Sequence, residues 1–264
     1  MKVYNNIAYV YDCFINWEER IQREDPFYQH LFMERLATSL LDIGCGSGGH
    51  AIHFAQMGYN VIGIDSAKDM VAFAQQKSEK NDIDIEFQCL PMTDYASRIQ
   101  QKFDAVICVG NNLPHLLEAS AVKKVFTETI ASMKETGVAI FHVLNYHRIM
   151  ANKRRDFPAS SRIVDDKEYL FLRHYDFLSP HLDFHFASAI KENDQWTAKS
   201  MQMKHHPWKD DELIELAKEA GFTQIMTYGG YDFSEFDAEK SHDFIMVCEL
   251  VEDEEEIKVE GYEA

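Results

Sequence analysis

The chain has 264 residues, of which 46% are hydrophobic, enough to bury one large core, which argues against disorder of the whole chain. Its 44 acidic residues outnumber its 26 basic ones, and the resulting formal charge of −18 repels nucleic acid and anionic membrane surfaces. We therefore expect a small-molecule substrate, no nucleic-acid partner and no membrane partner.

The five cysteines are odd in number, are spread along the chain and have no C-x-x-C spacing. This pattern is typical of reduced thiols and predicts no metal site. Residues 1–20 have neither the apolar region nor the cleavage site of a secretory signal, and no run approaches the ~20 apolar residues of a membrane span. We therefore expect a cytoplasmic protein.

Short apolar runs alternate with amphipathic stretches over residues 39–144. The runs SLLDIG, NVIGID, IEFQCL, FDAVICVG and VAIFHVL predict strands, and stretches such as HAIHFAQMG and AVKKVFTETIASMKETG predict helices. Gly58, Gly137 and Gly221 each follow a helical stretch, where a left-handed cap is expected. Strand alternating with helix predicts a Rossmann-like α/β fold with helices on both faces of a parallel sheet.

The pattern changes beyond Asn145. Over residues 162–204, alternating runs such as EYLFLRHYDF and LDFHFASAI are separated by turn signals, which predicts antiparallel strands that cover the active site. A helix is expected over 210–220, followed by a closing hairpin. We divide the chain into an N-terminal helical lid, a cofactor-binding α/β core, an antiparallel insertion, a helix and hairpin that complete the core sheet, and an acidic disordered tail: 1–38, 39–150, 151–206, 207–250 and 251–264.

A glycine-rich segment, LLDIGCGSGGHA, follows the first predicted strand. Gly44 and Gly46 allow a tight turn and close approach of the backbone to a ligand, and the next helix offers free N–H groups. Asp42 precedes the glycines, and Asp65 ends the next strand 21 residues after Gly44, the spacing at which a carboxylate reaches a ribose diol. The segment predicts an adenosine-containing ligand, with a nicotinamide cofactor as an alternative because Gly49 also completes the dinucleotide motif.

These features resemble those of class I S-adenosylmethionine-dependent methyltransferases: D-x-G-x-G-x-G after a strand, an acidic end to the next strand, and FDAVICVGNNLPHL further on. Within that class the chain is similar to the glycine and sarcosine N-methyltransferases, in NWEERIQREDPF, FDAVICVGNNLPHL and IASMKETGVAIFHVLNY. The resemblance covers about residues 4–250. It implies a mostly parallel seven-stranded sheet with a small antiparallel insertion, and methyl transfer from S-adenosylmethionine to a small-molecule acceptor by in-line displacement.

The resemblance also implies a cofactor site. Arg20 would bind the methionine carboxylate, Gly44 and its neighbours the amino group and homocysteine chain, and Asp65 the ribose hydroxyls. Adenine would contact Met70, Leu90 and Met92. The full set of candidates is Tyr11, Arg20, Asp42, Gly44, Cys45, Gly46, Asp65, Ser66, Met70, Leu90, Met92 and Val109. Tyr4 and Tyr9 resemble lid tyrosines in the same way as Tyr11.

Candidate catalytic residues lie on segments expected at the C-terminal edge of the sheet, where open α/β folds bind ligands: Asn111, His115, His142 and His206. Each has a structural alternative. Asn111 is also a typical turn former, His115 and His142 also suit a buried core, and the pair His205-His206 also suits the start of the next helix.

Leu144 stands in the segment where the glycine enzymes have a carboxylate-binding Arg, which argues against glycine or sarcosine as the acceptor. A nucleic-acid or protein methyltransferase, and a non-catalytic S-adenosylmethionine-binding protein, stay as alternatives. The acceptor, the choice between N- and O-methylation, and the oligomeric state, including a homo-oligomer, stay open.

Overall fold

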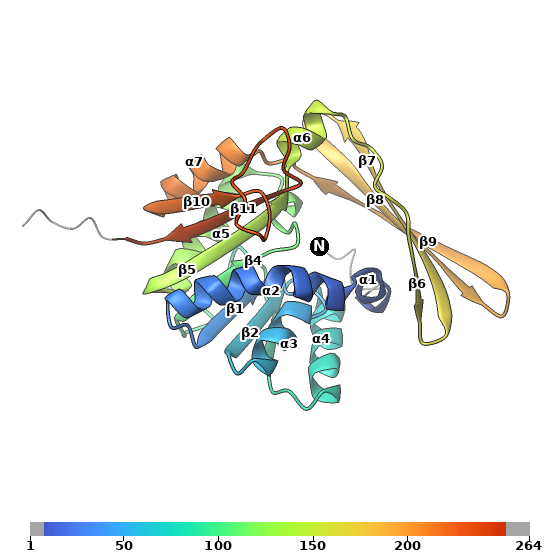
Figure 1. Ribbon diagram of the computed structural model, residues 1–264, viewed down its shortest axis with the longest axis horizontal. Helices are drawn as coiled ribbons and strands as arrows, with labels where there is room; N and C mark the ends of the chain where they lie inside the picture. Colours follow the sequence, from blue (N-terminus) through green and yellow to red (C-terminus); the bar gives the residue numbers. More distant parts are fainter. Residues whose placement is uncertain (1–7, 252–264) are drawn as a thin grey trace, which may run out of the picture.

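A seven-stranded sheet forms the centre of the α/β body in the computed structural model, which describes residues 8–251 (Figure 1). The strand order is β10-β11-β5-β4-β1-β2-β3. Five strands run parallel: β1 (Ser39–Ile43), β2 (Asn60–Asp65), β3 (Glu86–Cys89), β4 (Phe103–Cys108) and β5 (Met133–Leu144). The hairpin of β10 (Gln224–Tyr228) and β11 (Asp243–Glu249) adds to β5 in antiparallel register. The predicted fold class is confirmed.

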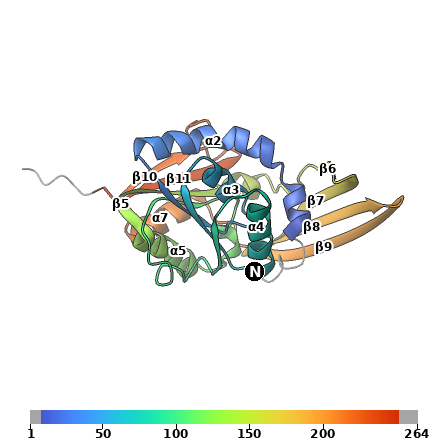
Figure 2. The ribbon, with the colours of Figure 1, turned by 90° about the horizontal axis from the view of Figure 1, so that it is seen from below.

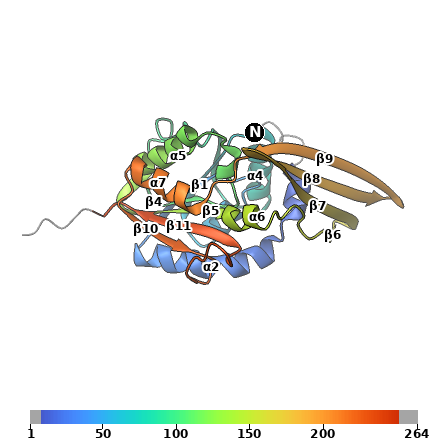
Figure 3. The same cartoon turned by 90° about the horizontal axis from the view of Figure 1, so that it is seen from above.

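Helices cover both faces of this sheet, which explains why its strands are continuously apolar. On one face α2 (Trp17–Glu34) and α3 (Gly49–Gln56) pack against residues such as Leu40 and Val61. On the other face α5 (Ala119–Ser132) and α7 (Asp210–Ala220) belong to the same hydrophobic cluster as the adjacent strand residues Leu41 and Ile62. Figures 2 and 3 show α2 on one side of the sheet and α5 with α7 on the other.

Two sequence expectations about helix ends differ in outcome. Gly58 and Gly221 have φ of 96° and 117°, as expected of left-handed caps. The expectation for Gly137 is wrong, because α5 ends at Ser132 and Gly137 lies inside β5. There is no room for a side chain at Gly137, since an added Cβ would be 2.9 Å from the Lys134 carbonyl oxygen.

A second, four-stranded sheet is antiparallel and projects from one end of the α/β body (Figures 1 and 2). It contains β6 (Ser160–Val164), β7 (Lys167–Leu178), β8 (His181–Glu192) and β9 (Gln195–His205). Helix α6 (Tyr146–Ala151) leads from β5 toward it. The predicted antiparallel strands are therefore present.

Helix α1 (Ala8–Phe14) links the two sheets. Its Cys13 and Phe14 pack against Phe171 and Phe186 of the antiparallel sheet. Its other side contacts α4 (Lys68–Lys80), where Ala8 packs with Met70. The expected lid tyrosine Tyr4 and the acidic tail from residue 252 lie outside the described residues. Of the described helices, none is long and apolar enough to cross a membrane.

Candidate active site

The glycine segment forms a tight loop between β1 and α3. Gly44, Gly46 and Gly48 have φ of 70°, 54° and 76°, a region that side chains with a Cβ rarely adopt. Gly44 has a second constraint, because an added Cβ would lie 2.4 Å from Asn112 Nδ2. Asn112 Nδ2 in turn donates to the carbonyl oxygens of Val109, at 2.8 Å, and Gly44, at 3.1 Å. The ends of β1 and β4 are thus tied together at this loop.

Asp65 ends β2 beside the glycine loop. Its Oδ2 accepts a hydrogen bond from the Gly46 N–H at 3.0 Å, and its Oδ1 accepts one from the Ala67 N–H at 2.8 Å. Burial raises the pKa of Asp65, and these backbone donors oppose that rise. A carboxylate offers about four lone-pair sites, so the two oxygens can still accept hydrogen bonds from a ligand.

Asp42, near the end of β1, is a buried carboxylate with one oxygen that lacks a hydrogen-bond partner within residues 8–251. Its side chain is 3% exposed, and its Oδ2 has no hydrogen-bond partner among the described residues. Burial, together with the nearby charge of Asp65, raises the pKa of Asp42 to about 7. A cationic ligand group beside Asp42 would satisfy this oxygen, because buried charges are normally paired.

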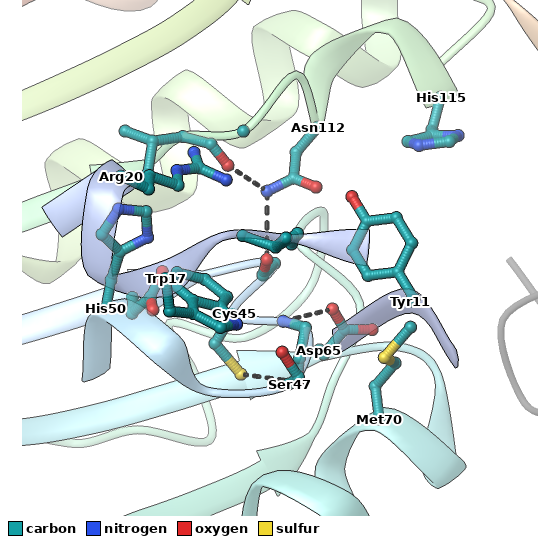
Figure 4. A pocket seen from close by; sticks show the side chains of 16 residues that line it. Tyr11, Trp17, Arg20, Cys45, Ser47, His50, Asp65, Met70, Asn112 and His115 are labelled. Atoms are coloured by element: carbon teal, nitrogen blue, oxygen red, sulfur yellow. Dashed lines mark hydrogen bonds between the residues drawn. The ribbon is translucent and has the colours of Figure 1, made fainter. Parts of the chain in front are cut away.

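A cavity lies above the glycine loop, with side chains from α1 and α2 on its far side (Figure 4). The predicted residues that line it are Tyr11, Arg20, Asp42, Gly44, Cys45, Gly46, Asp65, Met70, Val109 and His115. The other lining residues are Ile15, Trp17, Ser47, His50, Gly110 and Asn112. Of these, Gly110 lies in the segment from Val109 to Asn111, which the resemblance places beside the sulfonium, and the rest were not predicted. Three predicted cofactor residues, Ser66, Leu90 and Met92, are not among the lining residues, and Leu90 and Met92 lie in the hydrophobic core.

Arg20 is held in place by a buried carboxylate one helical turn away. Its Nε lies 2.9 Å from Glu24 Oε1, and His50 Nε2 lies 2.9 Å from Glu24 Oε2. Burial alone would raise the pKa of Glu24, but the hydrogen bond from His50 and the charge of Arg20 hold it well below its usual range. The Arg20 guanidinium reaches the end of β4, because a Cβ built on Gly110 would lie 3.4 Å from its Nη2.

A second cavity of about 450 Å³ lies between the α/β body and the antiparallel sheet. We call it the acceptor cavity. It shares Tyr11, Ile15, Arg20, Gly110 and His115 with the cavity above the glycine loop, so the two spaces adjoin. Its other lining residues are Phe14, Asn16, Glu19, Arg23, Glu24, Asn111, His142, Leu144, Phe157, Ser160, Arg162, Arg173, Tyr175, Phe184, Phe186, His205 and Asp243.

Comparisons with known proteins identify relatives of this chain. A methyltransferase domain model matches residues 40–137. The glycine/sarcosine N-methyltransferases of Aphanothece halophytica and Parasynechococcus marenigrum are 26% and 27% identical, each over 89% of this chain and 84% and 83% of their own lengths. A solved S-adenosylmethionine-dependent methyltransferase from Clostridium acetobutylicum has a TM-score of 0.75 at 16% identity, covering 94% of this chain and 98% of that one.

Residues 40–137 carry a methyltransferase domain, and the chain is an S-adenosylmethionine-dependent methyltransferase. Its cofactor is S-adenosylmethionine, and the residues above the glycine loop fit that molecule. The unpartnered Asp42 Oδ2 suits the ammonium of its amino-acid end, and the Asp65 carboxylate suits its ribose.

In this methyltransferase, Asn111 and His142 line the acceptor cavity and also fix the loop after β4. Asn111 has φ of 69°, its Oδ1 accepts from the Leu144 N–H at 3.0 Å, and its Nδ2 donates to Tyr146 Oη at 3.0 Å. His142 Nδ1 accepts from the Gly110 N–H at 3.2 Å, so its Nε2 donates to Asp243 Oδ1 at 3.0 Å. Both residues thus make the structural contacts of the alternative interpretation as well.

The other two catalytic candidates are placed differently. His115 lies on a short 3₁₀ helix, lines both cavities, and has its pKa lowered to about 4 by burial, so its imidazole is neutral at pH 7. His206 is not among the residues that line either cavity; its Nδ1 lies 3.3 Å from His181 Nδ1 and its ring packs on Trp208. Its neighbour His205 lines the acceptor cavity.

Proposed function

We propose that this methyltransferase methylates a nitrogen atom of a small molecule held in the acceptor cavity. The observation that carries the proposal is the cavity of about 450 Å³ that adjoins the glycine-loop cavity at Gly110 and His115. A cavity of this size suits a small molecule. The names of the glycine/sarcosine N-methyltransferases with which the chain aligns favour nitrogen over oxygen.

For the cofactor we propose the following contacts. Asp65 binds the ribose hydroxyls, Asp42 the ammonium and Arg20 the carboxylate of the amino-acid end, while Gly44, Cys45 and Gly46 present backbone groups. We propose that the remaining parts of the cofactor, the adenine and the sulfonium, are surrounded by Tyr11, Ser66, Met70, Leu90, Met92 and Val109. Asp42 and Asp65 support this best, because both are carboxylates at the cavity with free acceptor capacity.

S-adenosylmethionine, when bound, supplies a methyl group carried on a sulfonium, whose sulfur is a good leaving group because it departs as a neutral thioether. The protein's part is then to position the acceptor and exclude water, which can supply roughly 7–11 kcal/mol. Gly110 and Asn111 are proposed to align the acceptor nitrogen at the junction of the two cavities. His115 is proposed to accept the proton that this nitrogen must lose, because it lines both cavities.

The charge balance supports a small acceptor over nucleic acid or a membrane surface, since acidic residues outnumber basic ones by 18. The five cysteines are free thiols, which supports a reducing compartment such as the cytoplasm.

Calorimetric titration with S-adenosylmethionine and S-adenosylhomocysteine, followed by a product-release assay across small amines, amino acids and phenols, tests the proposal. We expect binding of both cofactor forms and turnover on an amine. Turnover confined to phenols would contradict nitrogen methylation. Binding without turnover on any small molecule would favour a non-catalytic cofactor-binding protein.

A further inference from the structure

One wall of the acceptor cavity carries an arginine without a carboxylate partner. Arg173, on β7, lies with its guanidinium 4.8 Å from the ring centroids of both Phe14 and Phe157. Among the described residues no ion pair or hydrogen bond involves its guanidinium. Burial lowers its pKa, as expected for a cation whose lost hydration is offset only by two aromatic rings.

The carboxylates of the cavity are already engaged elsewhere. Glu24 contacts Arg20 and His50, and Asp243 accepts from His142. Glu19 accepts from the Asn16 side chain at 2.8 Å. The surplus charge around Arg173 is therefore positive within a chain whose net charge is −18. A buried or partly buried cation of this kind is normally paired, so an anionic ligand group would complete the site.

The wall around Arg173 is largely apolar. In the register of the antiparallel sheet, Arg173 lies opposite Phe186 and Tyr175 lies opposite Phe184, so these side chains share the face that lines the cavity. Across the cavity Leu144 ends β5. The space thus offers a charged point on an otherwise aromatic and aliphatic surface.

A second group on this wall also lacks a partner. His205 is 3% exposed, and its Nε2 has no hydrogen-bond partner among the described residues. Its Nδ1 lies 3.3 Å from Tyr175 Oη, which lies 2.9 Å from Tyr146 Oη. Since Asn111 Nδ2 donates to Tyr146 Oη, the hydroxyls can donate in turn toward His205 Nδ1. A neutral His205 then carries its proton on Nε2 as a donor for a ligand.

We propose that the methyl acceptor is a small molecule with a carboxylate on an apolar body larger than a methylene, and that Arg173 binds this carboxylate while His205 Nε2 donates to another polar atom of the molecule. The proposal rests on the proposed function in one respect, namely that this cavity holds the acceptor. The guanidinium fork matches a carboxylate in a bidentate geometry, and the phenylalanine rings match the apolar body.

The test uses a matched pair of probes that need no turnover, 3-phenylpropanoate and 3-phenylpropanamide, titrated calorimetrically into the full chain saturated with S-adenosylhomocysteine. The probes have the same apolar body and differ in charge. We expect the carboxylate to bind on the order of tenfold to a hundredfold more tightly than the amide. Propanoate, which lacks the ring, should bind more weakly than 3-phenylpropanoate.

Arg173→Gln should reduce the preference for the carboxylate to near unity. Arg154→Gln is the matched control, because it removes the same charge from an arginine that contacts the same Phe157 ring, at 5.1 Å, without lining the acceptor cavity. Unchanged S-adenosylhomocysteine affinity shows that the variants are folded, and Arg173→Lys, which keeps the charge but loses the fork, should give an intermediate preference.

The proposal is overturned if the wild-type chain does not bind 3-phenylpropanoate, if it binds the amide equally well, or if Arg173→Gln keeps the preference. These outcomes are separate from a failure of the proposed function, which would appear as no turnover on any small amine despite cofactor binding. Turnover on neutral amines with no preference for amino carboxylates would likewise contradict the assignment of Arg173 while leaving N-methylation intact.

Discussion

Two nearby carboxylates, Asp42 and Asp65, differ in the hydrogen bonds that their oxygens accept. Asp65 receives N–H donors from Gly46 and Ala67, which stabilise its ionised form. Asp42 Oδ2 receives none, and burial together with the charge of Asp65 raises the pKa of Asp42 to about 7. The pair therefore suits two different ligand groups: hydroxyl donors at Asp65 and a cation at Asp42.

Asp65→Ala should weaken S-adenosylhomocysteine binding by roughly tenfold to a hundredfold, because two ribose hydroxyls would lose their acceptor in the cavity above the glycine loop. Asp69→Ala removes an exposed carboxylate from the first turn of α4 and should leave the affinity unchanged. Calorimetry on both variants provides the measurement, and equal affinity of Asp65→Ala and the wild type would refute the ribose assignment.

Cofactor affinity should rise with pH through about 7. In the ligand-free protein the raised pKa keeps Asp42 protonated below pH 7, whereas a bound ammonium favours its ionised form, so binding at low pH releases a proton. The affinity for S-adenosylhomocysteine should be roughly tenfold lower at pH 6 than at pH 8. Titrations in buffers of different ionisation enthalpy measure the released proton, and Asp42→Asn should flatten the profile; the same slope in that variant would rule out Asp42 as its source.

Among the structural elements, the glycine loop has two constraints: the positive φ of its glycines and a contact with a residue far away in the sequence. Three glycines take positive φ, and Asn112, from the loop after β4, fills the space beside Gly44. The loop is therefore shaped both by its own backbone and by the neighbouring strand.

Gly44→Ala should destabilise the protein more than Gly58→Ala does and should weaken cofactor binding by at least about tenfold. Both glycines have positive φ, so both substitutions carry a backbone cost of about 1–2 kcal/mol. Only Gly44 has a close neighbour, Asn112 Nδ2 at 2.4 Å, whereas a Cβ on Gly58 meets nothing within 4 Å. Urea unfolding and calorimetry separate the two effects; equal losses in both variants would show that φ alone matters.

At the scale of the whole molecule, two sheets meet across the acceptor cavity and α1 connects them. Phe14 of α1 contacts Phe171 and Phe186 at ring-centroid distances of 5.4 Å, while Tyr11 lines both cavities. Tyr9, by contrast, donates to Asp165 Oδ2 at the edge of the antiparallel sheet. Because Tyr11 of α1 lines the cofactor cavity, cofactor binding should strengthen the contacts between α1, the α/β body and the antiparallel sheet.

Excess S-adenosylhomocysteine should raise the melting temperature of the full chain. At a hundred times its dissociation constant the ligand adds about 2.7 kcal/mol to the free energy of unfolding, or roughly 5–10 °C for a chain of this size. Scanning fluorimetry measures the shift, and Asp65→Ala at the same ligand concentration should show only a small one. A wild-type shift near zero at saturation would indicate that the ligand does not bind the folded state preferentially.

From the sequence alone we predict the α/β class, the antiparallel insertion, the helix 210–220 and the glycine loop with its two carboxylates. These features depend on local periodicity, turn chemistry and short spacings along the chain, which are visible without coordinates. The resemblance to methyltransferases extended this to the cofactor. The end of α5 was misplaced, because the strand residues from Met133 follow the helix directly, without a breaker until Gly137.

The side chains that meet at the acceptor cavity can be identified only from the way in which the two sheets pack. His205, not His206, lines it, because adjacent residues at a strand end point to opposite sides. Trp17 and Arg173 enter the two cavities from α2 and β7, far from the glycine loop in sequence. No local pattern records such contacts, since they depend on how a lid helix and a second sheet pack against the core.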